Sequence, residues 1–205
     1  MIAHVIDDLF DPQFLVKLES EILNKVPVYS TNIANRTSYP YGFKGSHRLL
    51  GADIFVRDGH NRVDTLHPSA GIFFDAFEII ENNIFDCPIF LHRIDINLQC
   101  YGQDGSGHTD GSNDSEVTIM IMNNLQWKPE WGGQFQIVDE VNGNNVLEEH
   151  AYIPGRLLIF PGNHPHRGLA PLDRYAYRYT TVFRCSIDED IDVFVENYFN
   201  SRKLK

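Results

Sequence analysis

The N-terminal part of the chain carries apolar residues at helical spacing in two segments. Asp11 and Pro12 form an N-cap and first-turn pair, and the apolar stripe that follows predicts a helix over 11–25. Pro68 occupies a similar starting position, and a second stripe predicts a helix over about 68–84. The stripes consist of Phe14, Leu15, Leu18 and Ile22 in the first segment and Ile72, Phe73, Ala76, Ile79 and Ile80 in the second.

The segment between these helices, residues 27–66, is rich in Gly, Asn, Arg and Tyr and shows no clear period. Long stretches of this kind are either functional or ordinary loops. For residues 29–62, a substrate lid and a surface loop therefore both stay open.

From residue 88 onward the period changes to two, which is typical of strands with one face in a core. Apolar and polar residues alternate in the order Arg93, Ile94, Asp95, Ile96, Asn97, Leu98, Gln99, Cys100. Further strands are expected at 116–122, 133–138, 156–160 and 177–184, and turns rich in Gly and Pro separate them. Many short strands with such turns favour a mostly β fold, a sandwich or jelly roll with the early helices packed on one sheet.

The pattern is that of one domain, because no repeat or linker-like stretch interrupts 1–205. We expect a helical support over about 1–87 and a β core over about 88–185. Apolar residues recur at helical spacing after Asp188, with acids first and basic residues near the end, which predicts a final helix over about 188–203.

Composition narrows the class of partner. The chain has 42% hydrophobic and 12% aromatic residues, as expected of a packed globular protein, and its formal net charge is -11. Such a charge opposes binding to nucleic acid and to anionic membranes. The three cysteines, Cys87, Cys100 and Cys185, are widely spaced and suggest buried thiols in a reducing compartment. With no long apolar run and no signal-like start, the expectation is a soluble cytoplasmic protein.

The segment YGQDGSGHTDGSND contains the first candidate metal ligands. On an extended backbone, His108 and Asp110 project to the same face and can bind one ion. An imidazole and a carboxylate suit Fe(II), Zn or Mn, and two histidines with one carboxylate are typical of non-haem Fe(II) oxygenases. The His-x-Asp pair alone is weak evidence, so the following motifs carry the argument.

A third ligand is offered by PGNHPHRG, which follows the apolar strand RLLIF. His164 and His166 would lie about 7 Å apart along an extended segment, so only one of them is expected to coordinate. We expect His166. Arg178, at the start of the strand RYTTVFR, is a suitable bidentate partner for a carboxylate, and Thr180 on the same face could add a hydroxyl group.

The run of motifs LQCYGQDGSGHTD, EVTIMIMNNLQWKPEWGGQFQIV, GRLLIFPGNHPHRG and RYTTVF resembles the core of the 2-oxoglutarate and Fe(II)-dependent dioxygenase superfamily, in the prolyl 4-hydroxylase-like branch. The resemblance covers roughly residues 92–185 in the family's order. It implies a double-stranded β-helix (jelly roll) fold, with metal ligands His108, Asp110 and His166 and with Arg178 on the carboxylate of 2-oxoglutarate. It also implies that Tyr101 is a pocket residue and that Gly132-Gly133 turns the chain into the strand facing the site.

The activity implied by this resemblance is hydroxylation of a substrate C–H bond, with 2-oxoglutarate converted to succinate and carbon dioxide. Fe(II), 2-oxoglutarate and dioxygen are the implied cofactors, with ascorbate as an accessory candidate. A peptidyl prolyl residue is the first expectation for the substrate. The chain departs from the branch at Gly107, where an aromatic residue often precedes the first histidine, and near Met122, where some members have a second tyrosine.

Other functions remain open at this point. The substrate could be a small molecule, a free amino acid, a lipid or a nucleobase; Arg178 and Arg184 are spaced six apart, as in nucleobase-demethylating relatives, but the net charge opposes that reading. A jelly-roll protein that binds metal without turnover is a second alternative, and a zinc hydrolase is a third. Arg178 distinguishes them, because neither alternative needs a cation for a keto acid.

Overall fold

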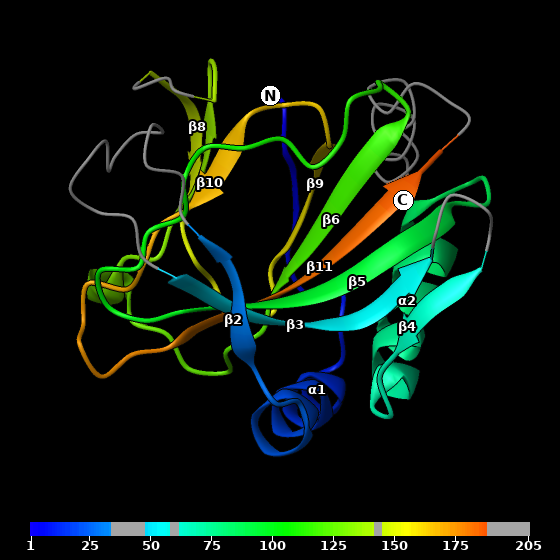
Figure 1. The fold of residues 1–205 in the computed structure, drawn as a ribbon, viewed down its shortest axis with the longest axis horizontal. Coiled ribbons are helices and arrows are strands. Elements are labelled where there is room, and N and C mark those ends of the chain that lie inside the picture. The colour runs from blue at the N-terminus through cyan, green and yellow to red at the C-terminus, as the bar shows by residue number, and fades with distance from the viewer. Residues whose placement is uncertain (34–47, 58–61, 142–144, 188–205) are drawn as a thin grey trace.

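The computed structural model describes residues 1–33, 48–57, 62–141 and 145–187 and contains two facing antiparallel sheets (Figure 1). The large, eight-stranded sheet has the order β1-β9-β6-β11-β5-β3-β2, with β4 paired to β3. The small sheet has the order β10-β7-β8. The strands of the large sheet are β1 (His4–Ile6), β2 (Tyr29–Ile33), β3 (Arg48–Arg57), β4 (Val63–Leu66), β5 (Phe90–Gln99), β6 (Glu116–Met122), β9 (Leu157–Pro161) and β11 (Arg178–Ser186). Those of the small sheet are β7 (Phe135–Val138), β8 (Val146–His150) and β10 (His166–Gly168).

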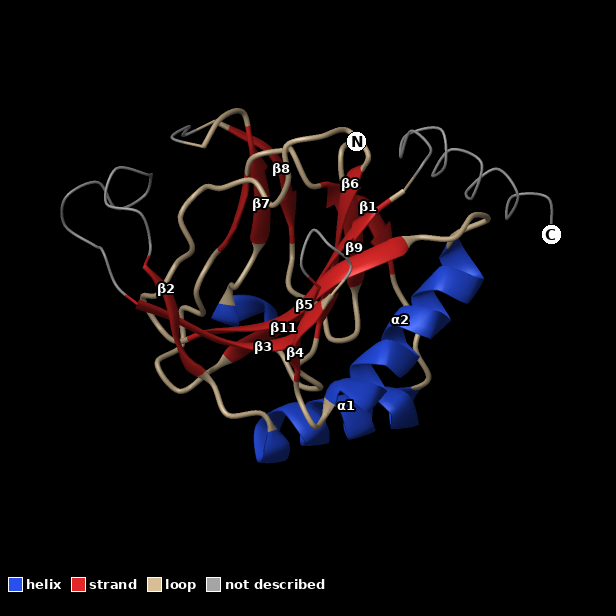
Figure 2. Ribbon diagram, turned by 45° about the vertical axis from the view of Figure 1, so that its right-hand side comes forward, coloured by secondary structure: helices blue, strands red, loops and turns tan. Residues whose placement is uncertain are grey.

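Two helices, α1 (Pro12–Lys25) and α2 (Ala70–Ile84), lie against the outer face of the large sheet (Figure 2). Asp11 caps α1 by accepting a hydrogen bond from the Gln13 amide. The proline at the first position costs no intrahelical bond, because the first amides of a helix have no intrahelical acceptor. Ile80 and Phe73 of α2 are fully buried in the resulting core. Burial of each such side chain contributes about 1.5–3 kcal/mol, which is enough to hold α2 without strong end caps.

The alternation along β5 and β11 separates this core from the functional face. Ile94 and Ile96 of β5, and Phe183 of β11, belong to the core beneath the helices. The neighbouring polar residues face the space between the two sheets, where a second apolar cluster surrounds them. This cluster combines both sheets and includes Met120, Met122, Phe135, Ile137, Leu158, Phe160 and Val182. One face of the large sheet therefore packs against the helices, and the other face lines the space between the two sheets, where the polar side chains lie.

The structure confirms the mostly β fold and both predicted helices, the second of which begins at Ala70 with Ser69 as its cap. Strand β6 has the predicted bounds, while β7 begins two residues later than expected because Gly133 is in a turn with a positive φ. The three cysteines are free, although only Cys185 is fully buried.

Several strands were not predicted. The segment 27–66 contains β2, β3 and β4, which extend the large sheet at its edge. Part of the lid interpretation for 29–62 and the predicted helix over 188–203 lie outside the described residues. Within the described part of the chain, no helix is long and apolar enough to cross a membrane.

Candidate active site

A cavity of about 570 Å³ lies between the two sheets. Its lining includes His108, Asp110, His166, Arg178 and Thr180, so the fold brings together five of the six site residues expected from the sequence. The sixth, Tyr101, is 60% exposed in the turn after β5 and is not among the lining residues. In the described structure Tyr101 therefore lies apart from the other five residues, in a turn that leaves the sheet, and its pocket role stays a prediction.

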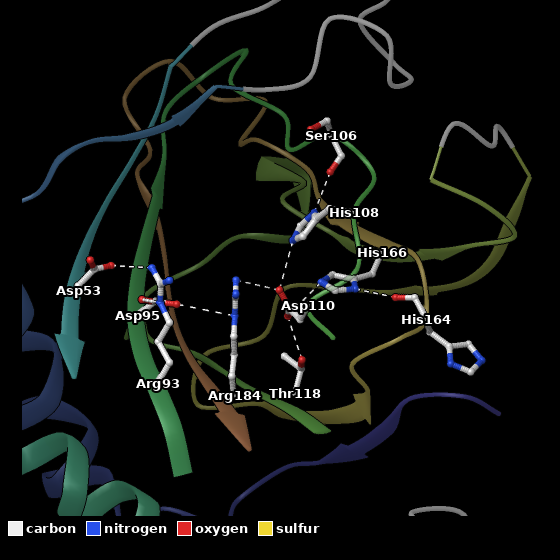
Figure 3. A network of polar contacts seen from close by, with 10 residues as sticks. All are labelled: Asp53, Arg93, Asp95, Ser106, His108, Asp110, Thr118, His164, His166 and Arg184. Atoms are coloured by element: carbon white, nitrogen blue, oxygen red, sulfur yellow. Dashed lines mark hydrogen bonds and ion pairs between the residues drawn. The ribbon is translucent and has the colours of Figure 1, made fainter. Parts of the chain in front are cut away.

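Three of these side chains form a candidate metal centre (Figure 3). One ligand atom from each of His108, Asp110 and His166 lies within 4.8 Å of the other two. His108 Nε2 is 3.7 Å from Asp110 Oδ1, and His166 Nε2 is 3.4 Å from Asp110 Oδ2. The backbone sets this geometry, because His108 and His166 exchange two hydrogen bonds as an isolated β-bridge and the Asp110 amide donates to the Gly162 carbonyl.

Both histidines are oriented by their other ring nitrogen. His108 Nδ1 donates to the Ser106 carbonyl at 3.0 Å, and His166 Nδ1 donates to the His164 carbonyl at 2.9 Å. These bonds use Nδ1 and orient each Nε2 toward Asp110, which is the arrangement that metal-binding histidines need. The ring of His164 points away from Asp110 in Figure 3, so its backbone, not its side chain, serves the site.

The surroundings keep His108 neutral and Asp110 charged. Desolvation, then the neighbouring His166, lower the pKa of His108 to about 4, although half of its side chain is exposed. Burial opposes ionisation of Asp110, but the hydrogen bond and charge of His166, with His108 and Arg184, outweigh it and lower the Asp110 pKa. Neutral imidazoles and an ionised carboxylate are the protonation states that bind a divalent metal.

Two side chains hold the Asp110 carboxylate. The Thr118 hydroxyl donates to Oδ2 at 2.9 Å, and Arg184 Nη2 forms an ion pair with Oδ1 at 2.9 Å. Each oxygen therefore has its own partner from the large sheet, Thr118 from β6 and Arg184 from β11. Such contacts to a ligating carboxylate fix its rotamer and raise metal affinity. Arg184 was noted in the sequence only for its spacing from Arg178.

Arg178 lies in the same cavity with its guanidinium buried. Its Nε donates to the Gly133 carbonyl at 2.9 Å, its Nη1 donates to Gln99 Oε1 at 2.7 Å, and its guanidinium carbon lies 5.2 Å from the centre of the Tyr152 ring. Burial lowers the pKa of Arg178 to about 10, so the group remains a cation at neutral pH. Its Nη2 is buried and has no hydrogen-bond partner among the described residues. An unsatisfied buried cation is costly, and a ligand carboxylate would satisfy it.

Gln99 is a functional residue that the sequence did not reveal. Its Nε2 donates to the carbonyls of Gln103 and Gly168, both at 2.9 Å, so the amide oxygen must face Arg178. A sequence search for cations and metal ligands passes over a neutral glutamine. The sequence feature that could have identified it is its position among the polar residues that alternate with apolar ones up to Cys100.

The departure at Gly107 has a steric cause. A Cβ atom at this position would lie 2.3 Å from the Val141 carbonyl oxygen, which is backbone and cannot easily move. The aromatic residue that often precedes the first histidine in the prolyl 4-hydroxylase-like branch therefore has no room here. The loop of Val141 occupies that space beside His108 instead.

Comparisons with known proteins agree with this geometry. Residues 96–183 match the family model of the 2OG-Fe(II) oxygenase superfamily. Over these residues the chain is similar to that superfamily. The matched segment spans β5 to β11 and so includes every residue of the candidate metal centre and Arg178. No sequence among the curated proteins matches the chain.

Solved structures of the superfamily share the fold. An oxidoreductase of the 2OG-Fe(II) oxygenase family from Burkholderia pseudomallei is 16% identical over 90% of this chain and 84% of that one, with a TM-score of 0.68. A Pseudomonas putida prolyl-4-hydroxylase is 14% identical over 91% and 93%, with a TM-score of 0.55. A Trichoplax adhaerens prolyl hydroxylase in complex with a hypoxia inducible factor peptide fragment is 16% identical over 95% and 86%, with a TM-score of 0.56.

The residues present fit the cofactors of the superfamily, Fe(II) and 2-oxoglutarate. Two imidazole nitrogens and one carboxylate make a donor set that Fe(II) accepts while leaving coordination positions open. The unsatisfied Nη2 of Arg178 suits the distal carboxylate of a keto acid in the same cavity.

Proposed function

We propose that this oxygenase hydroxylates a C–H bond, with His108, Asp110 and His166 as the iron ligands and Arg178 as the anchor of 2-oxoglutarate. The observation that carries the proposal is that one cavity contains both a three-residue metal centre and a buried guanidinium with an unused donor. A protein that only binds metal gains nothing from burying this cation. A hydrolase has no use for it either.

Iron and 2-oxoglutarate, when bound, would let dioxygen act as the oxidant: one oxygen atom would enter the substrate C–H bond and the other the cosubstrate, which would leave as succinate and carbon dioxide. The residues of the chain orient and protect these groups. His108 and His166 present Nε2, Thr118 and Arg184 fix the Asp110 carboxylate, and Gln99 holds Arg178. Thr180, buried beside Arg178 on the cavity floor, would contribute its hydroxyl group to the same carboxylate. The apolar lining, which includes Met120, Phe135, Phe160 and Val182, would exclude water.

For the substrate we propose a prolyl residue in a peptide. Half of the His108 side chain is exposed, so the metal centre is open on one side to a residue carried by a larger molecule. The similar Trichoplax structure holds a peptide fragment, and a Pseudomonas prolyl-4-hydroxylase has the same fold, which supports this choice.

The first experiment addresses the cofactors. Fe(II) and 2-oxoglutarate added without oxygen should produce a weak visible charge-transfer band. Asp110→Ala should abolish the band, while Asp139→Ala, which removes an exposed carboxylate, should retain it. A folded wild-type protein without the band would refute the iron and cosubstrate assignment.

The second experiment addresses the substrate. The loaded enzyme is exposed to oxygen in the presence of proline-containing peptides, and mass spectrometry follows the addition of one oxygen atom. Incorporation at proline is the expected result. A protein that shows the band but oxidises no prolyl peptide retains the oxygenase assignment and loses the prolyl one.

A further inference from the structure

A second cavity, of about 290 Å³, adjoins the candidate metal centre. It shares Asp110, Thr118 and Arg184 with the main cavity, and Arg57 and Arg93 also line it. Three guanidinium groups thus gather beside the metal centre of a chain that has only 17 basic residues and a net charge of -11. Such a concentration of one charge needs an explanation.

The strand register makes the cluster costly in the absence of a partner. Arg93 of β5 lies directly opposite Arg184 of β11, and Val56, the residue before Arg57, lies opposite Arg93 on its other side. Like charges on directly opposed strand positions destabilise a sheet. A purely structural role at this part of the sheet does not explain three arginines on the adjacent strands β3, β5 and β11.

Carboxylates compensate part of this charge, and Figure 3 shows those that contact Arg93 and Arg184. Arg93 is paired with Asp53 at 2.7 Å and with Asp95 at 2.6 Å. Arg184 is paired with Asp110 at 2.9 Å, and its Nε is 3.9 Å from Asp95 Oδ2. Under the proposed function the Asp110 charge is shared between the metal and Arg184 Nη2, and Arg184 Nε has only the 3.9 Å contact with Asp95.

Arg57 has no carboxylate partner among the described residues. Its guanidinium carbon lies 4.7 Å from the Phe90 ring centre and 5.6 Å from that of Phe55, so aromatic faces hold it in place. The Nε atoms of Arg57 and Arg184 are both buried without a hydrogen-bond partner in the described structure. These are donors that are already desolvated and still unused.

The other ionisable groups in this cavity do not fill that role. Glu116 accepts hydrogen bonds from the backbone amides of Ser112 and Asn113, which tie its carboxylate to the turn before β6. His92 is hydrogen bonded to the Ser186 hydroxyl at 2.9 Å, and desolvation lowers its pKa, so it adds no charge at neutral pH.

We propose that the cavity lined by Arg57, Arg93 and Arg184 binds a carboxylate group of the primary substrate. The inference rests on the proposed function, because it requires the metal at Asp110. Guanidinium forks match carboxylates bidentately. A carboxylate held here would lie on the Arg184 side of the metal centre, with the cosubstrate on the Arg178 side. The carbon to be oxidised would then lie between two anchored acids.

The carboxylate can come from the prolyl residue itself or from an acidic neighbour in a peptide, and matched probes separate the two. One pair is N-acetylproline and its amide. The other is a blocked peptide with Glu or with Gln beside proline. Affinities are measured by calorimetry on enzyme loaded with Fe(II) and saturating 2-oxoglutarate without oxygen, so that Arg178 is already occupied.

The acidic member of at least one pair should bind about tenfold more tightly than its neutral partner, as a charge-assisted hydrogen bond predicts. Arg57→Met should reduce this preference to about twofold or less, and Arg57→Lys should retain part of it. Lys128→Met removes an exposed cation near Trp131 and serves as the control for net charge, with the full preference retained.

Equal binding of acid and neutral probes by the wild-type protein, including no binding of either, would overturn the inference. So would an unchanged preference in Arg57→Met. The charge-transfer band is recorded in every variant. Its presence without the acid preference removes this inference alone, whereas its absence in the wild-type protein removes the proposed function as well.

Discussion

Arg178 and Arg184 lie on the same face of β11 but differ in burial and in their contacts with carboxylates. Arg178 is 2% exposed and contacts no carboxylate of the described residues; its contacts are two neutral oxygens and an aromatic ring. The side chain of Arg184 is 36% exposed and is paired with Asp110. Arg178, at one end of the strand, is therefore a cation with a donor available for an anionic ligand. Arg184, at the other end, is a cation already paired with the metal ligand Asp110.

The difference lies in what each end leaves unsatisfied. At the Arg178 end the described residues place no acid on the guanidinium, so none of them competes with a bound carboxylate. At the Arg184 end acids are abundant and hold the guanidinium in position. Because their neighbours differ, Arg178 is suited to bind 2-oxoglutarate and Arg184 to position Asp110. Variants of the two residues should separate these effects.

The largest effect is expected from Asp110→Ala, which removes the charged ligand common to both histidines. We expect metal affinity to fall by more than about 100-fold, because the remaining donors are two neutral imidazoles. Competition with a chromophoric chelator measures the affinity. Asp139→Ala is the control. Wild-type affinity in Asp110→Ala would mean that the metal lies elsewhere.

Arg178→Met should weaken 2-oxoglutarate binding by about 10–100-fold, since a charge-assisted hydrogen bond is lost. Metal affinity should stay within about twofold, because Arg178 contacts none of the three ligands. Titration of the charge-transfer band with 2-oxoglutarate gives the affinity. A variant with the wild-type requirement for the keto acid would disprove the anchor.

Arg184→Met should produce the reverse pattern. Metal affinity should fall by about tenfold, the usual cost of losing a contact to a ligating carboxylate, while the 2-oxoglutarate requirement at saturating metal is unchanged. Arg156→Met, which breaks a comparable ion pair with Asp7, serves as the matched control. Equal losses of metal and keto acid affinity in Arg184→Met would erase the distinction between the two ends.

The smallest effect is expected from Gln99→Glu, which places an acid beside the Arg178 guanidinium. The new carboxylate would pair with Arg178 and compete with the ligand, so the 2-oxoglutarate requirement should rise about five- to tenfold. The metal affinity should not change. Gln126→Glu makes the same charge change at an exposed position. If Gln99→Glu binds the keto acid like the wild type, Gln99 does not orient Arg178.

Much of the fold was predictable because local periods report burial directly. The stripes of α1 and α2 and the alternation in β5 and β11 each require only a core on one side. Strands β2, β3 and β4 were not predictable, because strand pairing rather than alternation defines them: β3 pairs with β5, and β2 and β4 pair with β3. Short strands such as β1 and β10 have too few residues to show a period.

The site followed a similar division. Spacing alone placed His108 and Asp110 on one face, and donor chemistry restricted the third ligand to His164 or His166. The choice between them depends on the β-bridge that sets His166 opposite His108, which connects residues far apart in the sequence. Tyr101 was expected in the pocket and lies in an exposed turn of the described structure, so its pocket role stays a prediction.

The sequence by itself determined which side chains are available: two imidazoles, a carboxylate and an arginine in a buried strand. Its alternation of polar and apolar residues also determined which strand positions face the core. Only the tertiary structure decided which of them meet, because the register of β5 with β11 and the bridge between His166 of β10 and His108 fix distances that no local pattern contains. The same register turned Gln99 toward Arg178 and gathered Arg57, Arg93 and Arg184 around one cavity. The chemistry of a side chain follows from the residue type alone, whereas its contacts depend on how the strands pair.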